Sequence, residues 1–390
     1  MKILQVIPVL YASSGGPAAV VRSISKELAK RHELTVYTTN ALDQRRGFNT
    51  YPFKVESNGY EIVYFPRILA SYGFNISPSM AIALQKTLPQ YDVVHLHSWR
   101  HFQDLIVHHY AKKYDIPYVL QAHGSIARVM AKQRLKWIYD VFFGYRLLKD
   151  ASKVIALNPI EAEQYRGMGV PREKIAIIPN GIDLSEYASL PPRGCFRKKF
   201  GLDKNEKIVL YLGRIHEIKG IDILVRAFAN ILHELDDVRL VIVGPNDGYL
   251  GEIEALIKAL QIEDTVLISG PLYGVAKLEA YVDADVYVLP SRYEIFGNTV
   301  LESVACGTPV ILTESCGIAE CFRDKVGLVV KNNSPPHLEE ALLEMLINRK
   351  RQKIFKENCK IVIQKFNISE TVAKLEEVYK EIITRSKNYL

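Results

Sequence analysis

A buried strand that leads into a helix, at residues 285–310, constrains the fold more than any other stretch. The run from Val286 to Leu289 is continuously apolar and is closed by Pro290, as in the central strands of a parallel sheet. A loop follows, and Asn298, a good N-cap residue, is expected to open a helix that runs to Cys306. In such strand–loop–helix units, ligands bind at the carboxyl end of the strand.

Two carboxylates, Glu294 and Glu302, flank the start of this helix. The helix N-terminus at Gly297–Thr299 suits an anion such as phosphate, because backbone N–H groups and the positive dipole end lie there. Glu302 can accept hydrogen bonds from the hydroxyls of a ribose, and Glu294 from a second hydroxylated group. Hydroxyls, phosphate and hydroxyls are the outline of a sugar nucleotide. On the spacing alone, two merely solvated glutamates remain an alternative.

The composition is that of a globular protein with room for two domains: 390 residues, 48% hydrophobic and 24% charged. No apolar run reaches the ~18 residues that a membrane span needs. The short apolar start, residues 1–10, indicates a first strand rather than a signal peptide. Five scattered cysteines without a C-x-x-C pair argue against a disulfide framework or a zinc site and favour a reducing cytoplasm.

Positive charge is concentrated in the first half. Residues 1–190 hold 23 Lys and Arg against 15 Asp and Glu, whereas residues 191–390 hold 27 against 28. This asymmetry predicts that the first half meets an anionic partner, a nucleic acid or a membrane surface. No RNA- or DNA-binding signature accompanies the charge, so no nucleic acid partner is expected.

Residues 126–150 predict a basic helix in which six Lys and Arg are interleaved with five aromatic residues. A helix of this kind can lie in the interface of a membrane. It can equally pack its aromatic side chains into a domain core and leave its charges in water. The pattern does not decide between the two.

Strands that alternate with helices in the first half predict a parallel sheet covered on both faces. The first strand, residues 2–8, leads into Gly15-Gly16 and then to Pro17, which suits the first turn of a helix. This is an anion-binding corner, but G-x-G-x-x-G is absent, which argues against a nicotinamide or flavin enzyme. A plain tight turn is the alternative for the glycine pair.

Three histidines, His95, His97 and His123, stand at the ends of predicted strands. A metal site is one interpretation, but no carboxylate or cysteine lies nearby at ligand spacing. We interpret His95 and His97 as satisfied core or rim histidines, and His123 as functional.

The second half offers cations for a diphosphate. Arg214 and Lys219 lie in one loop after the strand 207–212, where a forked guanidinium and an ammonium can both reach phosphate oxygens. Asp283 and Asp285 spell D-x-D, but they precede the buried strand and so lie away from the ligand side. No metal site is expected.

Five motifs together resemble, in family order, the retaining glycosyltransferases of family 4 (group 1): the glycine pair, His-Gly at 123–124, NGID at 180–183, GRIHEIKG at 213–220, and LPSRYEIFGNTVLESVACGTPVI at 289–311. The resemblance implies the α/β GT-B fold, two Rossmann-like domains facing each other across a cleft. It implies an acceptor-side domain over 1–187, a nucleotide-sugar domain over 188–368 and a last helix, 369–390, that crosses back to the first domain.

The resemblance also implies roles for individual residues. His123 and Glu294 would hold the transferring sugar, and Arg214 and Lys219 would stabilise the departing diphosphate. The donor would meet Gly15, Gly16, Leu272, Phe296, Gly297, Asn298, Thr299 and Glu302.

The expected activity is a retaining, metal-independent hexosyl transfer from a nucleotide-sugar, with UDP-sugar favoured over GDP-sugar and with no cofactor. The expected acceptor is a glycan or a lipid-linked or membrane-proximal molecule, as in polysaccharide or glycolipid biosynthesis. The protein is expected in the cytoplasm, attached peripherally to an anionic inner membrane face. A nucleotide-sugar epimerase of similar fold and a non-catalytic sugar-nucleotide-binding protein remain alternatives.

Overall fold

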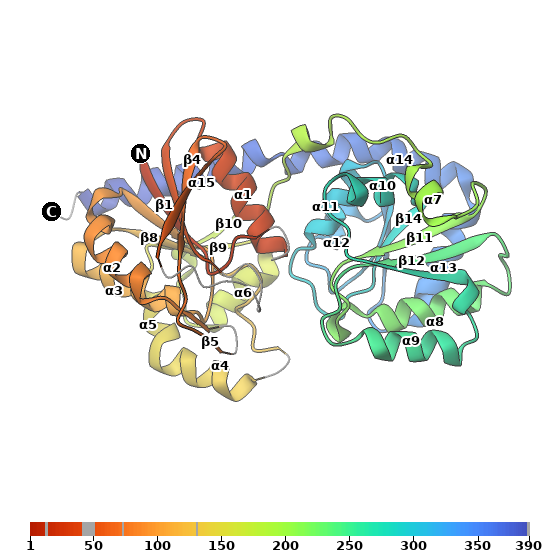
Figure 1. The fold of residues 1–390 in the computed structure, drawn as a ribbon, viewed down its shortest axis with the longest axis horizontal. Helices are drawn as coiled ribbons and strands as arrows, with labels where there is room; N and C mark the ends of the chain where they lie inside the picture. Colours follow the sequence, from red (N-terminus) through yellow and green to blue (C-terminus); the bar gives the residue numbers. More distant parts are fainter. Residues whose placement is uncertain (12–14, 41–50, 72–73, 130–131, 388–390) are drawn as a thin grey trace. The chain divides into compact units, whose positions relative to one another are not determined.

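The computed structural model describes residues 1–11, 15–40, 51–71, 74–129 and 132–387. The chain divides into two compact units, one made of Met1–Gly181 with Ile368–Leu390 and the other of Ile182–Asn367 (Figure 1). The sequence placed this division after residue 187 and the start of the returning helix at 369. Within the described ranges, no helix combines the length and the apolar character needed to cross a bilayer.

The first unit is built on an eight-stranded sheet with the order β10-β9-β8-β7-β1-β2-β4-β3. All neighbours are parallel except β3 and β4, which form an edge hairpin. The strand order reverses between β1 and β7. On one side of this point the chain adds β2 and then the β3–β4 hairpin, and on the other side it adds β8, β9 and β10. The strands are β1 Lys2–Val6, β2 Glu33–Thr39, β3 Phe53–Ser57, β4 Tyr60–Phe65, β7 Val93–Leu96, β8 Tyr118–Gln121, β9 Lys153–Ala156 and β10 Ile175–Ile177; β5 Leu69–Ser71 and β6 Phe74–Ile76 pair separately.

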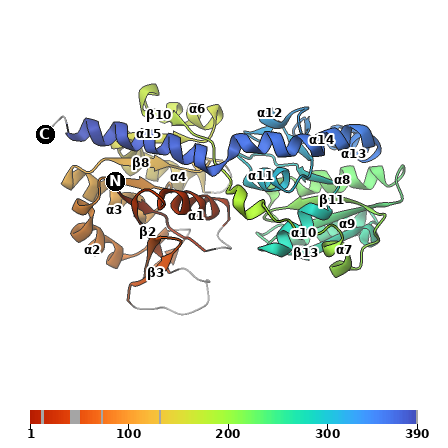
Figure 2. The same ribbon diagram turned by 90° about the horizontal axis from the view of Figure 1, so that it is seen from above.

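Helices cover both faces of this sheet. One core cluster packs α1 and the C-terminal helix α15 against the strands through Ile24, Val372 and Tyr379, and Figure 2 shows α15 beside α1. The other packs the remaining long helices against the opposite face. The helices are α1 Gly16–Leu28, α2 Pro78–Thr87, α3 Phe102–Tyr114, α4 Gln133–Tyr139, α5 Tyr145–Asp150, α6 Pro159–Gly167 and α15 Ile368–Lys387.

The second unit repeats the plan with a six-stranded parallel sheet, β13-β12-β11-β14-β15-β16, which reverses between β11 and β14. Its buried strands are nearly all Val, Ile, Leu and Tyr, as a sheet covered on both faces requires. The strands are β11 Lys207–Leu212, β12 Val238–Val243, β13 Val266–Gly270, β14 Val286–Leu289, β15 Val310–Thr313 and β16 Gly327–Val330. The helices are α7 Cys195–Phe200, α8 Ile221–Ile231, α9 Leu250–Ala259, α10 Val275–Asp283, α11 Asn298–Ala305, α12 Ala319–Phe322, α13 Pro335–Ile347 and α14 Arg349–Val362.

Two predictions of local structure were wrong. Asn298 is the first residue of α11 and not its cap, because Gly297, with φ 83°, occupies the cap position. The basic helix predicted over 126–150 begins only at Gln133, and it is interrupted by a π-helical segment, Asp140–Gly144, before α5. The polar stretch 41–60 predicts a loop with an edge hairpin; residues 41–50 lie outside the described residues, and the hairpin is present as β3 and β4.

Candidate active site

In the second unit, several of the predicted ligand-binding residues lie where the strand order of the sheet reverses, between β11 and β14. The loop after β11 carries Arg214 and Lys219, and the loop after β14 carries Glu294. Because β11 and β14 are neighbouring parallel strands, both loops lie at the carboxyl ends of the strands, on the same side of the sheet. This is the position at which open α/β sheets bind ligands.

A salt bridge holds the two loops together. Arg292 pairs in fork geometry with Asp222 at 2.7 and 2.8 Å, and the same guanidinium donates to the Glu217 carbonyl at 2.7 Å. Gly220, with φ 63°, lets the first loop pass so close to the Pro290 carbonyl that a Cβ would overlap it. The loop positions are therefore fixed by contacts behind the candidate site.

Lys219 and Glu294 meet directly, with 2.5 Å between Nζ and Oε2, and their side chains are only 16% and 18% exposed. The prediction gave them separate partners, the diphosphate and the sugar, and the structure shows that one neutralises the other. Arg214 is more exposed and pairs with Asp247 at 2.5 Å, a partner that sequence reasoning missed. The Asp247 carboxylate must release Arg214 for it to clamp a phosphate.

The N-terminus of α11 lies directly after the Glu294 loop. The Tyr287 hydroxyl donates to Oγ1 of Thr299 at 2.7 Å, which orients the first turn of the helix from the strand below. Gly297 is the N-cap and Asn298 the first residue of the helix, at the terminus where a phosphate site is expected. Phe296 is buried, so it can meet a donor only through its backbone.

Glu302 projects from α11 toward α10. It accepts hydrogen bonds from Nζ of Lys277 at 2.7 Å and from the Tyr281 hydroxyl at 3.0 Å. The sequence analysis predicted neither partner, because both are more than twenty positions from Glu302 in the chain and no local pattern indicates that they come into contact with it. Leu272, the predicted base contact, is half-buried in the loop after β13.

The first unit carries the other predicted residues at the carboxyl ends of β1 and β8. Gly15 precedes α1 with φ 81° and ψ −165°, a backbone conformation open essentially to glycine alone. Its neighbour Gly16 opens α1, which places Pro17 in the first turn of the helix, and residues 12–14 lie outside the described ranges. His123 follows β8 with φ 51°.

A buried glutamate that sequence reasoning missed supports the His123 loop. Glu161 accepts hydrogen bonds from the backbone N–H groups of Gly124 at 2.6 Å and Leu157 at 2.8 Å. Burial raises the pKa of its carboxyl to about 7. Asn158 caps α6, and Glu161 stands three residues later, the spacing of a capping box. That spacing was the signal that could have revealed it.

His95 and His97 are core residues, as interpreted, but they are not satisfied. Among the described residues, the Nε2 atom of each is buried without a hydrogen-bond partner. Nδ1 of His97 lies 3.1 Å from Nε2 of His123, and Nδ1 of His95 lies 2.6 Å from the Tyr379 hydroxyl. Burial lowers the pKa of His95 and His123 to about 3, so these rings are neutral at pH 7.

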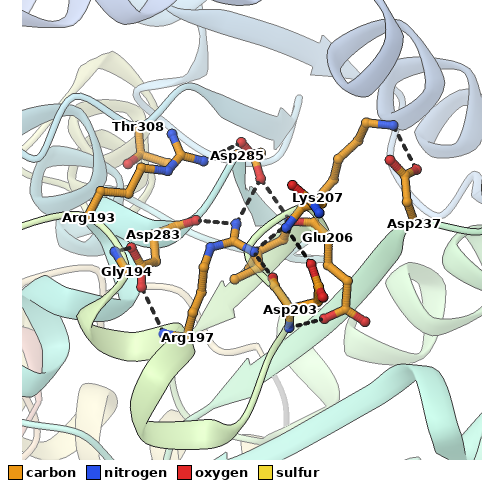
Figure 3. Close-up of polar contacts among 12 residues, drawn as sticks. Arg193, Gly194, Arg197, Asp203, Glu206, Lys207, Asp237, Asp283, Asp285 and Thr308 are labelled. Atoms are coloured by element: carbon orange, nitrogen blue, oxygen red, sulfur yellow. Dashed lines mark hydrogen bonds and ion pairs between the residues drawn. The ribbon is translucent and has the colours of Figure 1, made fainter.

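The D-x-D carboxylates fasten α7 to the sheet (Figure 3). Asp283 accepts the backbone N–H groups of Gly194 and Arg197, and Asp285 pairs with Arg193 and Arg197. Their oxygens are thus occupied by internal donors. No group of three or more His, Cys, Asp or Glu with a metal-holding arrangement occurs in the described part of the chain.

Sequence comparison identifies the family. The model of glycosyl transferases group 1 matches residues 193–362, and that of glycosyltransferase family 4 matches residues 14–186. The chain belongs to the family 4 (group 1) glycosyltransferases. It is therefore a glycosyltransferase, and the resemblance inferred from its motifs is confirmed.

Individual relatives agree with this assignment. The chain is 27% identical over 320 residues to a D-inositol 3-phosphate glycosyltransferase of Kineococcus radiotolerans, covering 75% of this chain and 72% of the relative. It is 29% identical over 333 residues to an alpha-monoglucosyldiacylglycerol synthase of Streptococcus pneumoniae, covering 81% and 72%. Among solved structures, Anabaena HepE in complex with UDP and glucose matches with a TM-score of 0.79 at 18% identity, covering 98% of this chain and all of that one. The fold is accordingly GT-B.

Proposed function

We propose that this glycosyltransferase moves a sugar from a nucleotide-sugar donor with retention of the anomeric configuration. The observation that carries the proposal is the Lys219–Glu294 pair, which lies at the reversal of the second sheet and immediately before the N-terminus of α11. A cation and a helix N-terminus together suit a diphosphate, and a carboxylate beside them suits sugar hydroxyls.

Departure of the diphosphate is the step for which this arrangement is best suited. Charge that develops on the leaving phosphate oxygen is stabilised by Lys219, by Arg214 once it leaves Asp247, and by the N–H groups that begin α11. Glu294 is neutralised by Lys219 and is a poor candidate for a covalent nucleophile. Retention then follows when the acceptor hydroxyl attacks the anomeric carbon on the face from which the diphosphate leaves and gives its proton to the departing phosphate oxygen, with Glu294 and His123 orienting the sugar.

The donor is proposed to be a UDP-sugar, which finds support in the structure of Anabaena HepE with UDP and glucose. Glu302 would bind the ribose and Leu272 the base. The test incubates the protein with UDP-sugars and a membrane lipid extract and measures UDP release and the anomeric configuration of the product. We expect UDP to be released together with a glycosylated product that is α-linked when the sugar of the donor is α-linked. An epimerised donor, or binding without release, would instead favour an epimerase or a sugar-nucleotide-binding protein.

We further propose that the acceptor is lipid-linked or membrane-proximal and that the first unit docks peripherally on an anionic, cytoplasmic bilayer face. The support is an exposed apolar surface on α4, the π-helical segment and α5. Figure 1 shows where α4 and α5 lie in the first unit. Trp137 is 52% exposed and Phe142 70%, so these aromatic side chains do not enter the core. The surface consists of Leu135, Trp137, Ile138, Val141, Phe142, Phe143 and Tyr145.

Charge complementarity favours a bilayer over a protein partner for this surface. Exposed Arg134, Arg146 and Lys149 accompany the apolar side chains, and each cation near an anionic leaflet contributes about 1 kcal/mol. Lys136 is partly buried and donates to the Val129 carbonyl, so it contributes less. The Streptococcus pneumoniae relative is named for a lipid product, which agrees with a lipid acceptor.

Liposome flotation tests this docking. The protein is expected to float with vesicles containing anionic phosphatidylglycerol and not with neutral phosphatidylcholine vesicles, and salt should weaken binding. Reversal of Arg134, Arg146 and Lys149 to Glu should abolish flotation, and Phe142→Ser should weaken it. The matched control reverses three exposed lysines of the second unit, Lys198, Lys204 and Lys350. No flotation at low salt, or equal loss in the control, would contradict the proposal.

A further inference from the structure

The contact between His97 and His123 determines which nitrogen of His123 is available to a ligand. His97 follows β7 and His123 follows β8, two neighbouring parallel strands. Nδ1 of His97 and Nε2 of His123 are 3.1 Å apart, so one of them carries the proton and the other accepts it. Both rings are neutral at pH 7, since burial lowers the pKa of His97 well below its usual range and that of His123 to about 3.

The other nitrogen of His97 decides which of the two donates. His97 is 2% exposed, and within the described ranges its Nε2 has no hydrogen-bond partner. A buried N–H without an acceptor is rarer and more costly than a buried acceptor without a donor. The proton of neutral His97 therefore belongs on Nδ1, where it is donated to Nε2 of His123. The proton of neutral His123 must then lie on Nδ1.

The surroundings hold both rings in this arrangement. The His95 ring lies tilted against that of His97 with 3.8 Å between centroids, and the Tyr379 hydroxyl of α15 hydrogen-bonds His95. The backbone beyond His123 is held by Glu161 through the Gly124 N–H. His97 thus has little freedom to turn its Nδ1 away from His123.

We propose that His97 is a positioning residue that locks His123 in the tautomer with the proton on Nδ1. His123 then offers a ligand a neutral hydrogen-bond donor and no basic nitrogen, so it binds an oxygen of the substrate and does not accept a proton from it. That this oxygen belongs to the transferring sugar or the acceptor rests on the proposed function. The tautomer itself does not.

Nitrogen NMR of the histidine-labelled protein tests the tautomer without donor or acceptor, because protonated and bare ring nitrogens resonate far apart. Single His→Asn variants assign the signals. The expected result is a protonated Nδ1 and a bare Nε2 on His123, together with a protonated Nδ1 on His97. A protonated Nε2 on His123, or a cationic ring at either position at pH 7, would overturn the proposal even if the protein proves to be an active glycosyltransferase.

A pair of variants tests the positioning role in the active enzyme. His97→Asn places an amide donor near the position of Nδ1, whereas His97→Gln places it near Nε2. We expect His97→Asn to keep kcat within about threefold of the wild type and His97→Gln to lose about tenfold, with similar thermal midpoints. A merely structural role predicts equal losses in the two, which would overturn the positioning role. Should neither variant fold, the NMR measurement on the wild type still decides, with the His97 signals assigned by elimination from the His→Asn variants of the other histidines.

Discussion

The two units share a strand order that reverses in the middle, yet the residues at the two reversals differ in charge. We call the loops at the carboxyl ends of the strands, where the strand order reverses, the rim of each unit. In the second unit the rim carries two ion pairs, Lys219–Glu294 and Arg214–Asp247. In the first unit it contains the neutral rings of His97 and His123. The same backbone plan therefore carries charged groups in one unit and neutral rings in the other, and the side chains at the strand ends make the difference.

The difference suits the two halves of a transfer reaction. A diphosphate needs compensating charge as it leaves, and ion pairs supply it once a ligand takes the place of one partner. A sugar or an acceptor hydroxyl needs direction but no charge, and neutral donors and acceptors provide it. The buried Glu161, with its pKa raised to about 7, fits the second pattern, because its carboxyl is partly uncharged near neutral pH.

Breaking the Lys219–Glu294 pair is expected to give the largest effect. Glu294→Ala should lower kcat about a hundredfold, equivalent to about 2.7 kcal/mol, because the sugar loses its carboxylate partner. Lys219→Ala should raise the donor dissociation constant at least tenfold, because the diphosphate loses a cation. Steady-state kinetics and calorimetry with the donor measure the two effects.

The double variant sharpens that test. If the two side chains act as a unit, the fold-loss of kcat/KM in the double variant should be smaller than the product of the fold-losses of kcat/KM in the two single variants. The exposed Lys198→Ala serves as the control for removing one positive charge. Wild-type kinetics in both single variants would show that the rim of ion pairs is not the donor site.

The neutral rim of the first unit makes a prediction about pH. His95 is fully buried, and its pKa falls from 6.5 when unfolded to about 3 when folded. Stability from this group is complete above pH 6.5 and is lost as the pH falls toward 3, because only the unfolded state then binds the proton. Between pH 7 and pH 5 the loss is about 2 kcal/mol. Denaturant unfolding of His95→Asn should show a pH dependence weaker by that amount, whereas an equal slope would contradict a neutral ring.

Glu302 should have a smaller effect on donor binding. Its carboxylate is already oriented by Lys277 and Tyr281, so the ribose hydroxyls meet a prepared acceptor. Glu302→Ala should raise the donor dissociation constant about tenfold, or 1.4 kcal/mol, with little change in kcat. Thermal shift with UDP measures the change, and Tyr281→Phe should give only part of it. A loss confined to kcat would place Glu302 at the reacting centre instead.

The sequence predicted the fold well wherever periodicity reports burial. Short apolar runs such as 208–212 and 286–289, closed by turn residues, favour buried strands, and both lie in strands of the sheet, Lys207–Leu212 and Val286–Leu289. Asn298 shows the limit of such reasoning, because the cap depends on a backbone angle that Gly297 adopts more readily. Residues 126–150 show another, since no local pattern reveals whether an aromatic side chain will find a neighbour.

The candidate site was predicted residue by residue but not pair by pair. Arg214, Lys219, Glu294 and Glu302 follow from strand ends and a helix start, which are local features. Their partners Asp247, Lys277 and Tyr281 come from other loops and helices, and only the sheet order brings them together. The contact between His97 and His123 likewise depends on β7 lying beside β8, and the contact between His95 and Tyr379 depends on α15 returning to the first unit.

Chelation should have the smallest effect of all, namely none. The proposed diphosphate site of the second unit has two cations, Arg214 and Lys219, and the D-x-D carboxylates are occupied by Arg197, Arg193 and backbone N–H groups (Figure 3). Activity measured with EDTA should therefore equal activity with added Mg²⁺ or Mn²⁺. Asp283→Asn provides the contrast: it should lower the thermal midpoint, because a buried acceptor of two N–H groups is impaired, while kcat of the folded protein stays unchanged. Loss of activity in EDTA that Mn²⁺ restores, together with loss of kcat in a folded Asp283→Asn protein, would mean that the diphosphate is held by a metal and that the two rims do not divide the work by charge alone.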